Sequence, residues 1–126
     1  MKSPWKSMQT FLPDREYVVL ATSIPPVSRS STLRLFKGAS SVRKQLASTS
    51  GVVGFSTMAR PWQKQYATLS VWTDEQSLAT FASSNPHRKL MTDLAPEMGP
   101  TTFLRWTIHG SDGKPSWADA LRRLGT

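Results

Sequence analysis

The chain has 126 residues, with hydrophobic content of 38% and charged content of 19%, which favours a single domain able to bury a core. It contains no cysteine, so disulfide bonds, thiolate catalysis and cysteine-based zinc or iron–sulfur sites are excluded. Sixteen Lys and Arg against eight Asp and Glu give a formal charge of +8, which can favour anionic partners but does not determine the fold.

Residues 1–14 show no regular hydrophobic period, and we interpret them as an amino-terminal arm before a domain that spans 15–126. The arm is either a flexible terminus or a segment laid, through its apolar side chains, over its own domain or a partner subunit. No apolar core of a signal peptide follows Lys2 and Lys6, and the uncharged run from Tyr17 to Ser28 is too short to span a bilayer. We therefore expect a cytoplasmic protein without a membrane span.

Residues 17–24 predict a strand with apolar side chains on both faces, as in a central strand that is covered on both sides. A helix follows, and either Ser31 or Thr32 can cap it. Its apolar side chains recur at helical spacing, at Leu35, Ala39, Val42 and Leu46. Its basic side chains are expected on the surface, at Arg34, Lys37, Arg43 and Lys44. Residues 52–60 then predict a second strand, which a short turn joins to a third.

The third strand, residues 66–72, alternates with a period of two. This alternation places one set of side chains on a single face, namely Tyr66, Thr68, Ser70 and Trp72. Thr73 has the capping-box spacing to a glutamine and predicts a helix over 74–84. Asn85 and the proline after it end that helix and begin another over 86–95, with Asn85 as its cap.

Residues 102–109 predict a fourth strand, and Ser116 can cap a last helix. The resulting order, β-α-β-β-α-β with a C-terminal helix, predicts a ferredoxin-like α+β fold in which strands 17–24 and 66–72 are central. In this arrangement the helices are expected to cover one face of the sheet. Because the other face also carries apolar side chains, we expect a second subunit to cover it, which makes the protein a homodimer.

Residues 70–91 read SVWTDEQSLATFASSNPHRKLM, which resembles the third strand and second helix of the dimeric α+β barrel proteins. That superfamily includes the antibiotic-biosynthesis monooxygenases, the spheroidene monooxygenase-like proteins and related domains of unknown function. The later segments LRWTIHG and KPSWADALRRLG resemble the last strand and trailing helix of some of those uncharacterised domains. The resemblance implies two subunits that pair as a dimeric α+β barrel, with a cavity between sheet and helices in each.

The resemblance has departures at the positions where the related enzymes carry their chemistry. Trp72 matches the tryptophan at the strand end of the monooxygenases, but Thr68 stands where they have an asparagine. The haem-degrading relatives place a histidine about where this chain has Phe81 and Ala82, and His87 lies a turn beyond. Neither mechanism therefore transfers residue by residue.

A candidate site nevertheless follows from these residues. We expect the walls of a pocket for a hydrophobic or aromatic small molecule to be Trp62, Tyr66, Ser70, Trp72 and Phe81. His87 is the candidate base, and Arg60 or Arg105 is the candidate partner for a substrate anion. The structural alternatives stay open: Trp72 as core, His87 as a helix-end residue, and both arginines as ordinary solvent-facing cations.

The leading functional hypothesis is a monooxygenase-like oxidation without a cofactor, in which the protein supplies a base and stabilises the developing charge. One alternative is a haem-binding protein or haem-dependent enzyme with His87 as the iron ligand. Another is a non-catalytic ligand-binding or assembly module. A basic face beside Phe36 raises the question of nucleic acids, but no recognition motif accompanies it, so we expect no specific nucleic-acid partner.

Overall fold

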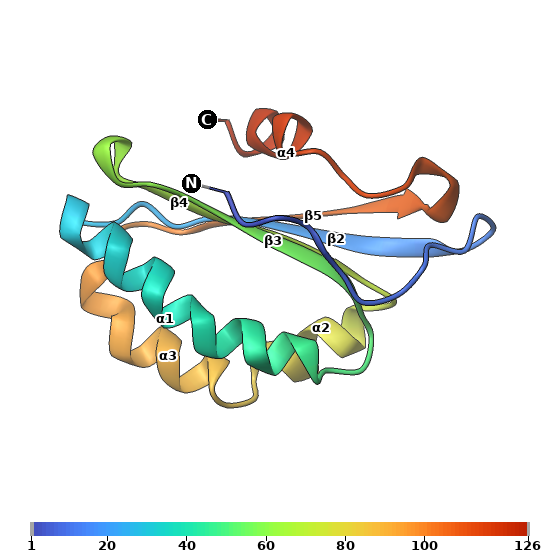
Figure 1. Ribbon diagram of the computed structural model, residues 1–126, viewed down its shortest axis with the longest axis horizontal. Helices are drawn as coiled ribbons and strands as arrows, with labels where there is room; N and C mark the ends of the chain where they lie inside the picture. The colour runs from blue at the N-terminus through green and yellow to red at the C-terminus, as the bar shows by residue number, and fades with distance from the viewer. Residues whose placement is uncertain (1, 126) are drawn as a thin grey trace.

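The computed structural model describes residues 2–125, which form a five-stranded antiparallel sheet in the order β1-β3-β4-β2-β5 (Figure 1). The strands are β1 (Lys6–Ser7), β2 (Glu16–Ser23), β3 (Val52–Arg60), β4 (Gln65–Trp72) and β5 (Thr102–His109). The helices are α1 (Arg29–Ala47), α2 (Glu75–Ala82), α3 (His87–Leu94) and α4 (Trp117–Leu124), with short 3-10 helices η1 (Pro61–Gln63), η2 (Ala95–Glu97) and η3 (Gly110–Asp112). Within the described range, every helix falls short of the length and hydrophobicity that a bilayer crossing requires.

The order of the elements confirms the predicted α+β class and ferredoxin-like topology. β2 and β4 pair with each other at the centre of the sheet, β5 flanks β2, and β3 flanks β4. β1 adds a short outer strand beside β3, with Lys6 opposite Phe55. Residues 17–24 were predicted as central from their apolar side chains on both faces and residues 66–72 from the expected topology, and both strands indeed lie where neither edge meets solvent.

Two helices begin at residues other than those expected. α1 is capped by Ser28, whose Oγ accepts the backbone N–H of Ser31 at 3.1 Å, so the predicted cap at Ser31 or Thr32 is wrong by one turn. The cap of α2 is likewise not Thr73, because the carboxylate of Asp74 accepts the first-turn N–H at 2.7 Å. In both cases several good acceptors stand within a few residues, and spacing alone did not rank them.

The later helices give one correction and one agreement. α3 begins at His87 and has no side-chain cap, so the predicted role of Asn85 is not observed. Ser116 caps α4 as predicted, since its Oγ accepts the N–H of Asp119 at 3.0 Å.

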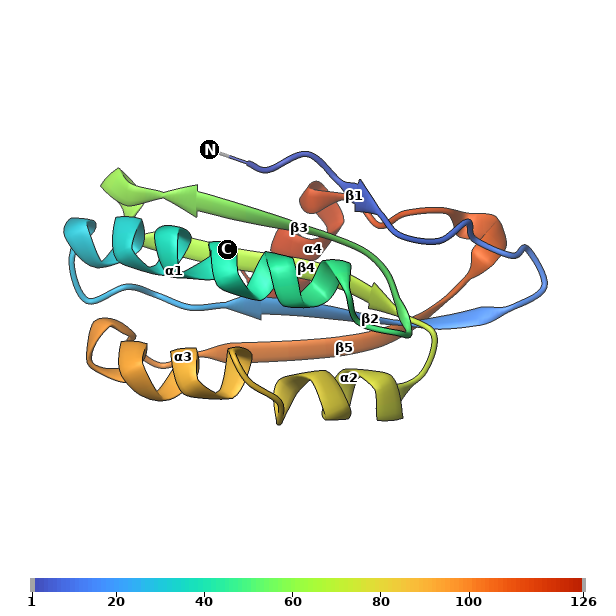
Figure 2. The same cartoon turned by 60° about the horizontal axis from the view of Figure 1, so that its bottom comes forward.

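One face of the sheet carries α1, α2 and α3, with α1 over β3 and β4 and the other two helices along the β5 side (Figure 2). α3 lies against α1 at Gly38, where a Cβ atom would come within 3.1 Å of the side chains of Leu90 and Leu94. The glycine, which weakens an isolated helix, therefore allows the two helices to approach closely. α3 itself has no buried residue, and it covers the sheet at a distance.

The other face is covered by the same chain, which corrects the expectation that helices would cover only one face. α4 and the amino-terminal arm lie over this face (Figure 1). They enclose a core of buried side chains, namely Tyr17, Val19, Ala21, Val53, Leu69, Val71 and Ala120. Half-buried Trp5, Phe11 and Trp117 pack against that core. The apolar surface that led to the homodimer prediction is thus already covered within one chain.

The amino-terminal arm makes specific contacts with strand β3. Ser3 accepts the backbone N–H of Thr57 through its Oγ at 2.8 Å and donates its own N–H to the carbonyl of the same residue at 2.8 Å. The ring of Trp5 lies over Gly54, where a Cβ atom would meet it at 2.3 Å. Only glycine leaves room for this indole, so the arm and the strand β3 are matched in shape.

Candidate functional site

A cavity of about 220 Å³ lies between the sheet and the helices α1, α2 and α3. Most of its lining is apolar, including Leu35, Leu46, Trp72 and Phe81. Polar side chains reach it at few points, among them Arg43, Thr57, Tyr66, Thr68, Ser70 and His87. An apolar space with a small number of polar groups is the usual composition of a small-molecule site.

The floor of the cavity is β4, and its side chains alternate as the sequence predicts. Tyr66, Thr68, Ser70 and Trp72 all line the cavity. The indole of Trp72 is only 1% exposed, donates from Nε1 to Ser70 Oγ at 2.9 Å, and lies 5.2 Å from the ring of Phe81 between centroids. Trp72 is therefore both a core residue and a cavity wall.

His87 lies on the cavity wall at the start of α3, 5.1 Å from the Phe81 ring between centroids. Its Nδ1 is 3.0 Å from the carbonyl oxygen of Ala82. Since a carbonyl oxygen can only accept, Nδ1 carries the hydrogen of this bond, and the neutral ring has its lone pair on Nε2. Nε2 has no hydrogen-bond partner among residues 2–125, so this nitrogen can accept a proton.

The backbone of His87 is also held in place. Its N–H donates to Oε1 of Gln45 on α1 at 3.0 Å. The Gln45 side chain in turn donates to the carbonyl of Phe81 at 3.4 Å. One α1 side chain therefore joins the end of α2 to the start of α3 and positions the imidazole.

Tyr66 and Arg43 form a second polar region of the cavity. Tyr66 is 3% exposed, and burial raises the pKa of its hydroxyl well above the usual value, while the nearby Arg43 guanidinium lowers it in part. Tyr66 is therefore a neutral hydroxyl at physiological pH. Arg43 is half-buried, and its Nη1 lies 3.5 Å from Thr57 Oγ1, at the long limit of a hydrogen bond.

The remaining predicted site residues are placed differently. Arg105 lines the edge of the cavity on β5, with its side chain 56% exposed and 3.7 Å from the carboxylate of Glu75. Arg60 is exposed at the end of β3, where it contacts Gln65 at 3.5 Å, and it does not line the cavity. Trp62 is 76% exposed and also lies outside the cavity lining. The structure thus brings Arg105, but not Arg60 or Trp62, to the predicted pocket.

Arg43 is the cavity residue that the sequence interpretation missed, because it was expected on the helix surface. The signal was present in the spacing. Arg43 follows Leu35 and Ala39 at intervals of four, and both of those residues are buried in the stripe of α1 that faces the sheet. Its spacing therefore predicts a charged side chain beside the buried face of α1, where the cavity lies.

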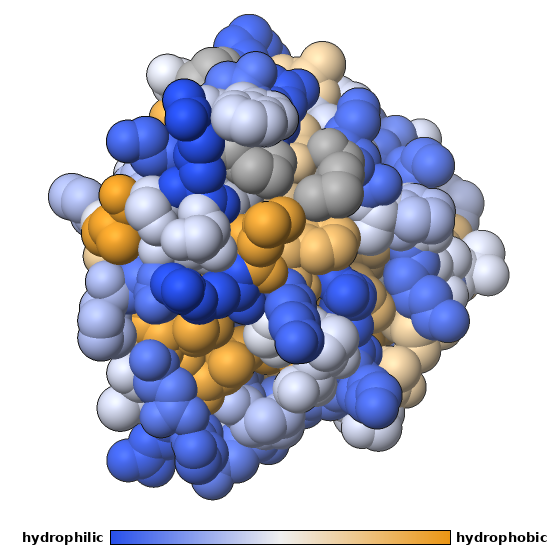
Figure 3. All heavy atoms as spheres, turned by 60° about the vertical axis from the view of Figure 1, so that its left-hand side comes forward, coloured by the Kyte–Doolittle hydropathy of each residue, from blue (hydrophilic) through white to orange (hydrophobic). Residues whose placement is uncertain are grey.

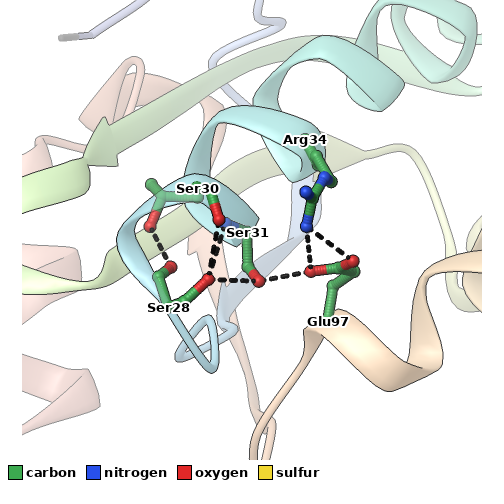
Figure 4. A network of polar contacts seen from close by, with 6 residues as sticks. Ser28, Ser30, Ser31, Arg34 and Glu97 are labelled. Atoms are coloured by element: carbon green, nitrogen blue, oxygen red, sulfur yellow. Dashed lines mark hydrogen bonds and ion pairs between the residues drawn. The ribbon is translucent and has the colours of Figure 1, made fainter.

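The end of the cavity region where α1 begins and η2 ends is fixed by a polar network (Figure 4). Arg34 Nη1 donates to both carboxylate oxygens of Glu97, at 2.9 and 3.1 Å, and Ser31 donates to the same carboxylate. At this end of the molecule, hydrophobic residues gather between hydrophilic ones (Figure 3). Within residues 2–125, no group of three or more His, Asp or Glu side chains could hold a metal ion.

Comparison with known proteins gives no match in sequence but a consistent match in structure. No family model matches the chain, and no curated protein matches its sequence. A proposed monooxygenase from Fusobacterium nucleatum is similar over 79% of this chain, with a TM-score of 0.66 and 12% identity. This chain spans only 45% of that protein's length.

Two shorter proteins match over most of their own length. A proposed antibiotic biosynthesis monooxygenase from Nitrosomonas europaea has a TM-score of 0.64 at 11% identity, over 71% of this chain and 95% of its own. A variant of SnoaB, a cofactor-independent oxygenase from Streptomyces nogalater, has a TM-score of 0.56 at 15% identity, over 73% and 92%. At such identities the likeness concerns the fold and not the residues of a site. The chain thus has the ferredoxin-like fold of the antibiotic-biosynthesis-monooxygenase-like proteins, as its sequence resemblance predicted.

Proposed function

We propose that the chain binds a small hydrophobic or aromatic molecule in the cavity and oxidises it with molecular oxygen, as a cofactor-independent monooxygenase does. The observation that carries the proposal is the position of His87. Its ring lies on the wall of an otherwise apolar cavity, with Nδ1 fixed by the Ala82 carbonyl and Nε2 able to accept a proton. A base held in this way next to an apolar space suits removal of a proton from a bound carbon acid.

The proposed reaction begins with a substrate whose methylene group is activated by neighbouring aromatic rings or a carbonyl. Nε2 of His87 takes one proton, and the resulting carbanion, or enolate, transfers electrons to oxygen to form a peroxide. The O–O bond then breaks as the second hydrogen leaves the same carbon. One oxygen atom ends in the new carbonyl group, the other in water, and the substrate supplies all the electrons.

Each predicted site residue that lines the cavity has a place in this proposal. Trp72, Tyr66 and Phe81 would form the aromatic walls, and Ser70 would keep the indole oriented through its hydrogen bond. Arg105 would attract an acidic substrate at the cavity edge. Arg60 and Trp62 have no role in it, because they lie outside the lining.

The homodimer remains part of the proposal in a changed form. It was predicted because a second subunit would cover the apolar face of the sheet, and α4 and the arm cover that face here. A partner subunit must therefore either displace these segments or bind elsewhere on the surface. Light scattering at micromolar concentration distinguishes a dimer from the 14.0 kDa chain alone.

The alternative with haem is less well supported by the cavity. His87 resembles a metal-ligating histidine in one respect, since its second ring nitrogen donates to a carbonyl. However, a volume of about 220 Å³ is too small for a haem macrocycle. A Soret band in the purified protein would favour this alternative over the proposed reaction.

Anthrone is a suitable probe, because its methylene group lies between two aromatic rings and its conversion to anthraquinone is the proposed reaction. We expect oxygen consumption with anthraquinone formed in equal amount and no cofactor added. His87→Gln should lower the rate by about 10²–10⁴-fold. Arg88→Gln, which changes the next residue on the exposed surface of α3, is the matched control and should leave the rate unchanged.

Binding of anthrone without oxygen consumption would instead support the third hypothesis, a non-catalytic binding module. Equal rates in wild type and His87→Gln would contradict the role of His87 as the base. In that case the histidine is a helix-end residue that joins α3 to the end of α2.

A further inference from the structure

Arg43 is a half-buried cation without an acidic partner. It lies on the cavity wall, and among the ion pairs of residues 2–125 none includes it. A guanidinium has five N–H donors, and the one hydrogen bond of Arg43 among the described residues is the long contact to Thr57. Its flank is supported by the ring of Phe36, 5.3 Å from the guanidinium carbon. The side chain is thus oriented but not neutralised.

The hydroxyl of Tyr66 is a second unpartnered donor in the same region. Throughout residues 2–125, every fully buried side-chain polar atom has a hydrogen-bond partner. The Tyr66 hydroxyl has none, so it is not sealed in the core and instead retains access to the cavity that the residue lines. Tyr66 as a whole is only 3% exposed, and its side chain lines the cavity. Arg43 lines the same cavity, and its guanidinium offsets in part the rise that burial causes in the pKa of this hydroxyl.

We propose that Arg43 and Tyr66 together form an anion-binding pair inside the cavity, and that the natural ligand is a small aromatic or apolar molecule with a negatively charged oxygen. The guanidinium supplies the charge and the phenol supplies a neutral donor. The surrounding apolar wall strengthens both interactions by excluding water. This inference rests on the proposed function, because it assigns the polar group of the molecule that occupies the same cavity.

The pair also explains why the cavity contains a cation at all. A half-buried charge without an anion is costly, and a ligand oxygen that bonds to it recovers part of that cost. In the proposed reaction the enolate formed when His87 removes a proton carries such an oxygen. A carboxylate on the substrate would meet the same chemistry before the reaction begins.

The test compares two probes of the same size, 2-naphthoate and its neutral analogue 2-naphthamide, through quenching of tryptophan fluorescence at pH 7. We expect the wild type to bind naphthoate at least about tenfold more tightly than naphthamide. Arg43→Gln should remove most of this preference, and Tyr66→Phe should reduce it. Lys44→Gln is the matched control, since Lys44 is an exposed cation one residue further along the same helix.

Thermal unfolding of each variant shows whether it is folded, and Arg43→Lys, which restores the charge, should recover part of the preference. Wild-type protein that binds both probes equally, or neither, would overturn the anion site. So would Arg43→Gln with an unchanged preference, or Lys44→Gln with an equal loss. Binding of naphthamide without any preference leaves the apolar cavity and the proposed oxidation standing. A naphthoate preference in a protein that does not oxidise anthrone supports the anion site alone.

Discussion

The two faces of the sheet are covered in different ways, one by a closed core and the other by helices that leave a cavity. On the face under α4 and the arm, side chains of β2 and β4 such as Val19 and Leu69 are at most 1% exposed and form a continuous apolar core. On the face under α1, α2 and α3, the alternate side chains of the same strands surround a cavity and include hydroxyl groups. Because adjacent residues of a strand point to opposite faces, each strand carries both patterns at once.

The difference lies in what covers each face. α4 and Trp5 pack directly on the sheet, and the indole of Trp117 donates to Ser56 at 3.0 Å. α3 instead packs on α1 at Gly38 and has no residue buried against the sheet. A helix that packs on another helix rather than on the strands leaves space between itself and the sheet. We therefore expect ligand binding on the loosely covered face and the larger contribution to stability from the closed one.

Among the variants that test the two faces, Trp72→Ala is expected to have the largest effect on stability and binding. Trp72 lies at the boundary between core and cavity. The indole is 1% exposed, so its removal should lower the free energy of unfolding by about 3–5 kcal/mol. It should also weaken naphthamide binding, since a cavity wall disappears. Chemical denaturation and probe titration of the same sample measure the two effects. Loss of stability with unchanged binding would show that the probe binds outside this cavity.

Val71→Ala, on the closed face of the same strand, tests stability separately from binding. Val71 is buried within the core under α4 and does not line the cavity, and truncation should cost about 1–3 kcal/mol of unfolding free energy. Probe binding by the fraction that remains folded should be unchanged, because the side chain belongs to the opposite face. A variant that loses binding in proportion to stability would contradict the separation of the two faces.

The sequence predicted the local pattern of both faces well. The alternation at 66–72 correctly assigned Tyr66 and Trp72 to the face that became the cavity, and helical spacing correctly found the stripe of α1. These are properties of neighbouring residues, which a period of two or of 3.6 displays directly. The family resemblance correctly predicted the fold for the same reason, since it rests on a continuous run.

What the sequence did not show depends on contacts between distant residues. The last helix was predicted, but its docking on the far face of the sheet was not, and this led to the argument for a second subunit. Arg60 was predicted as a candidate anion partner and Arg43 as a surface cation, although it is Arg43 that lies on a stripe facing the sheet and lines the cavity. Which of the two arginines lines the cavity depends on how α1 packs over β3. Arg43 and its contact Thr57 on β3 are 14 residues apart in the chain.

A smaller effect is expected from Trp117→Phe, which tests how α4 closes its face. A smaller aromatic ring remains, but the N–H donor to Ser56 is lost, so the unfolding free energy should fall by at least about 1 kcal/mol. Ser56 keeps its bond to the Ser3 carbonyl at 2.7 Å and is not left unsatisfied. The double variant with Ser56→Ala, compared with both single variants, measures the coupling. An additive double variant would mean that this hydrogen bond does not hold α4 to the sheet.

If α4 covers the sheet in solution, its loosening should also change association. Light scattering of the Trp117→Ala variant should show more self-association than the wild type, because part of the apolar face is uncovered. The wild type itself should keep this face closed at every concentration. A wild-type dimer that Trp117→Ala dissociates would place α4 in the subunit interface instead.

The smallest expected effect is on the pH dependence of stability. It is tested on two carboxylates, one on each side of the sheet. The Ser31 hydrogen bond and then the Arg34 guanidinium hold the pKa of Glu97 below its usual value of 4.5, and bonds from Arg123 and Arg122 do the same for Asp119, whose usual pKa is 3.8. Each lowered pKa contributes stability that is present above the unfolded-state value and is lost as pH falls through the folded-state value. The difference in thermal midpoint between wild type and Glu97→Gln should therefore be present at pH 7 and shrink below about pH 4.5.

Asp119→Asn should show the same sign in a similarly acidic range, because both carboxylates ionise more readily in the folded chain. The two variants should differ in naphthamide binding at pH 7. Glu97 joins η2 to the start of α1 at the end of the cavity region, whereas Asp119 bonds within α4 on the opposite face. We expect Glu97→Gln to weaken naphthamide binding and Asp119→Asn to leave it unchanged. An equal change in both variants would mean that the cavity does not depend on the contact between α1 and η2.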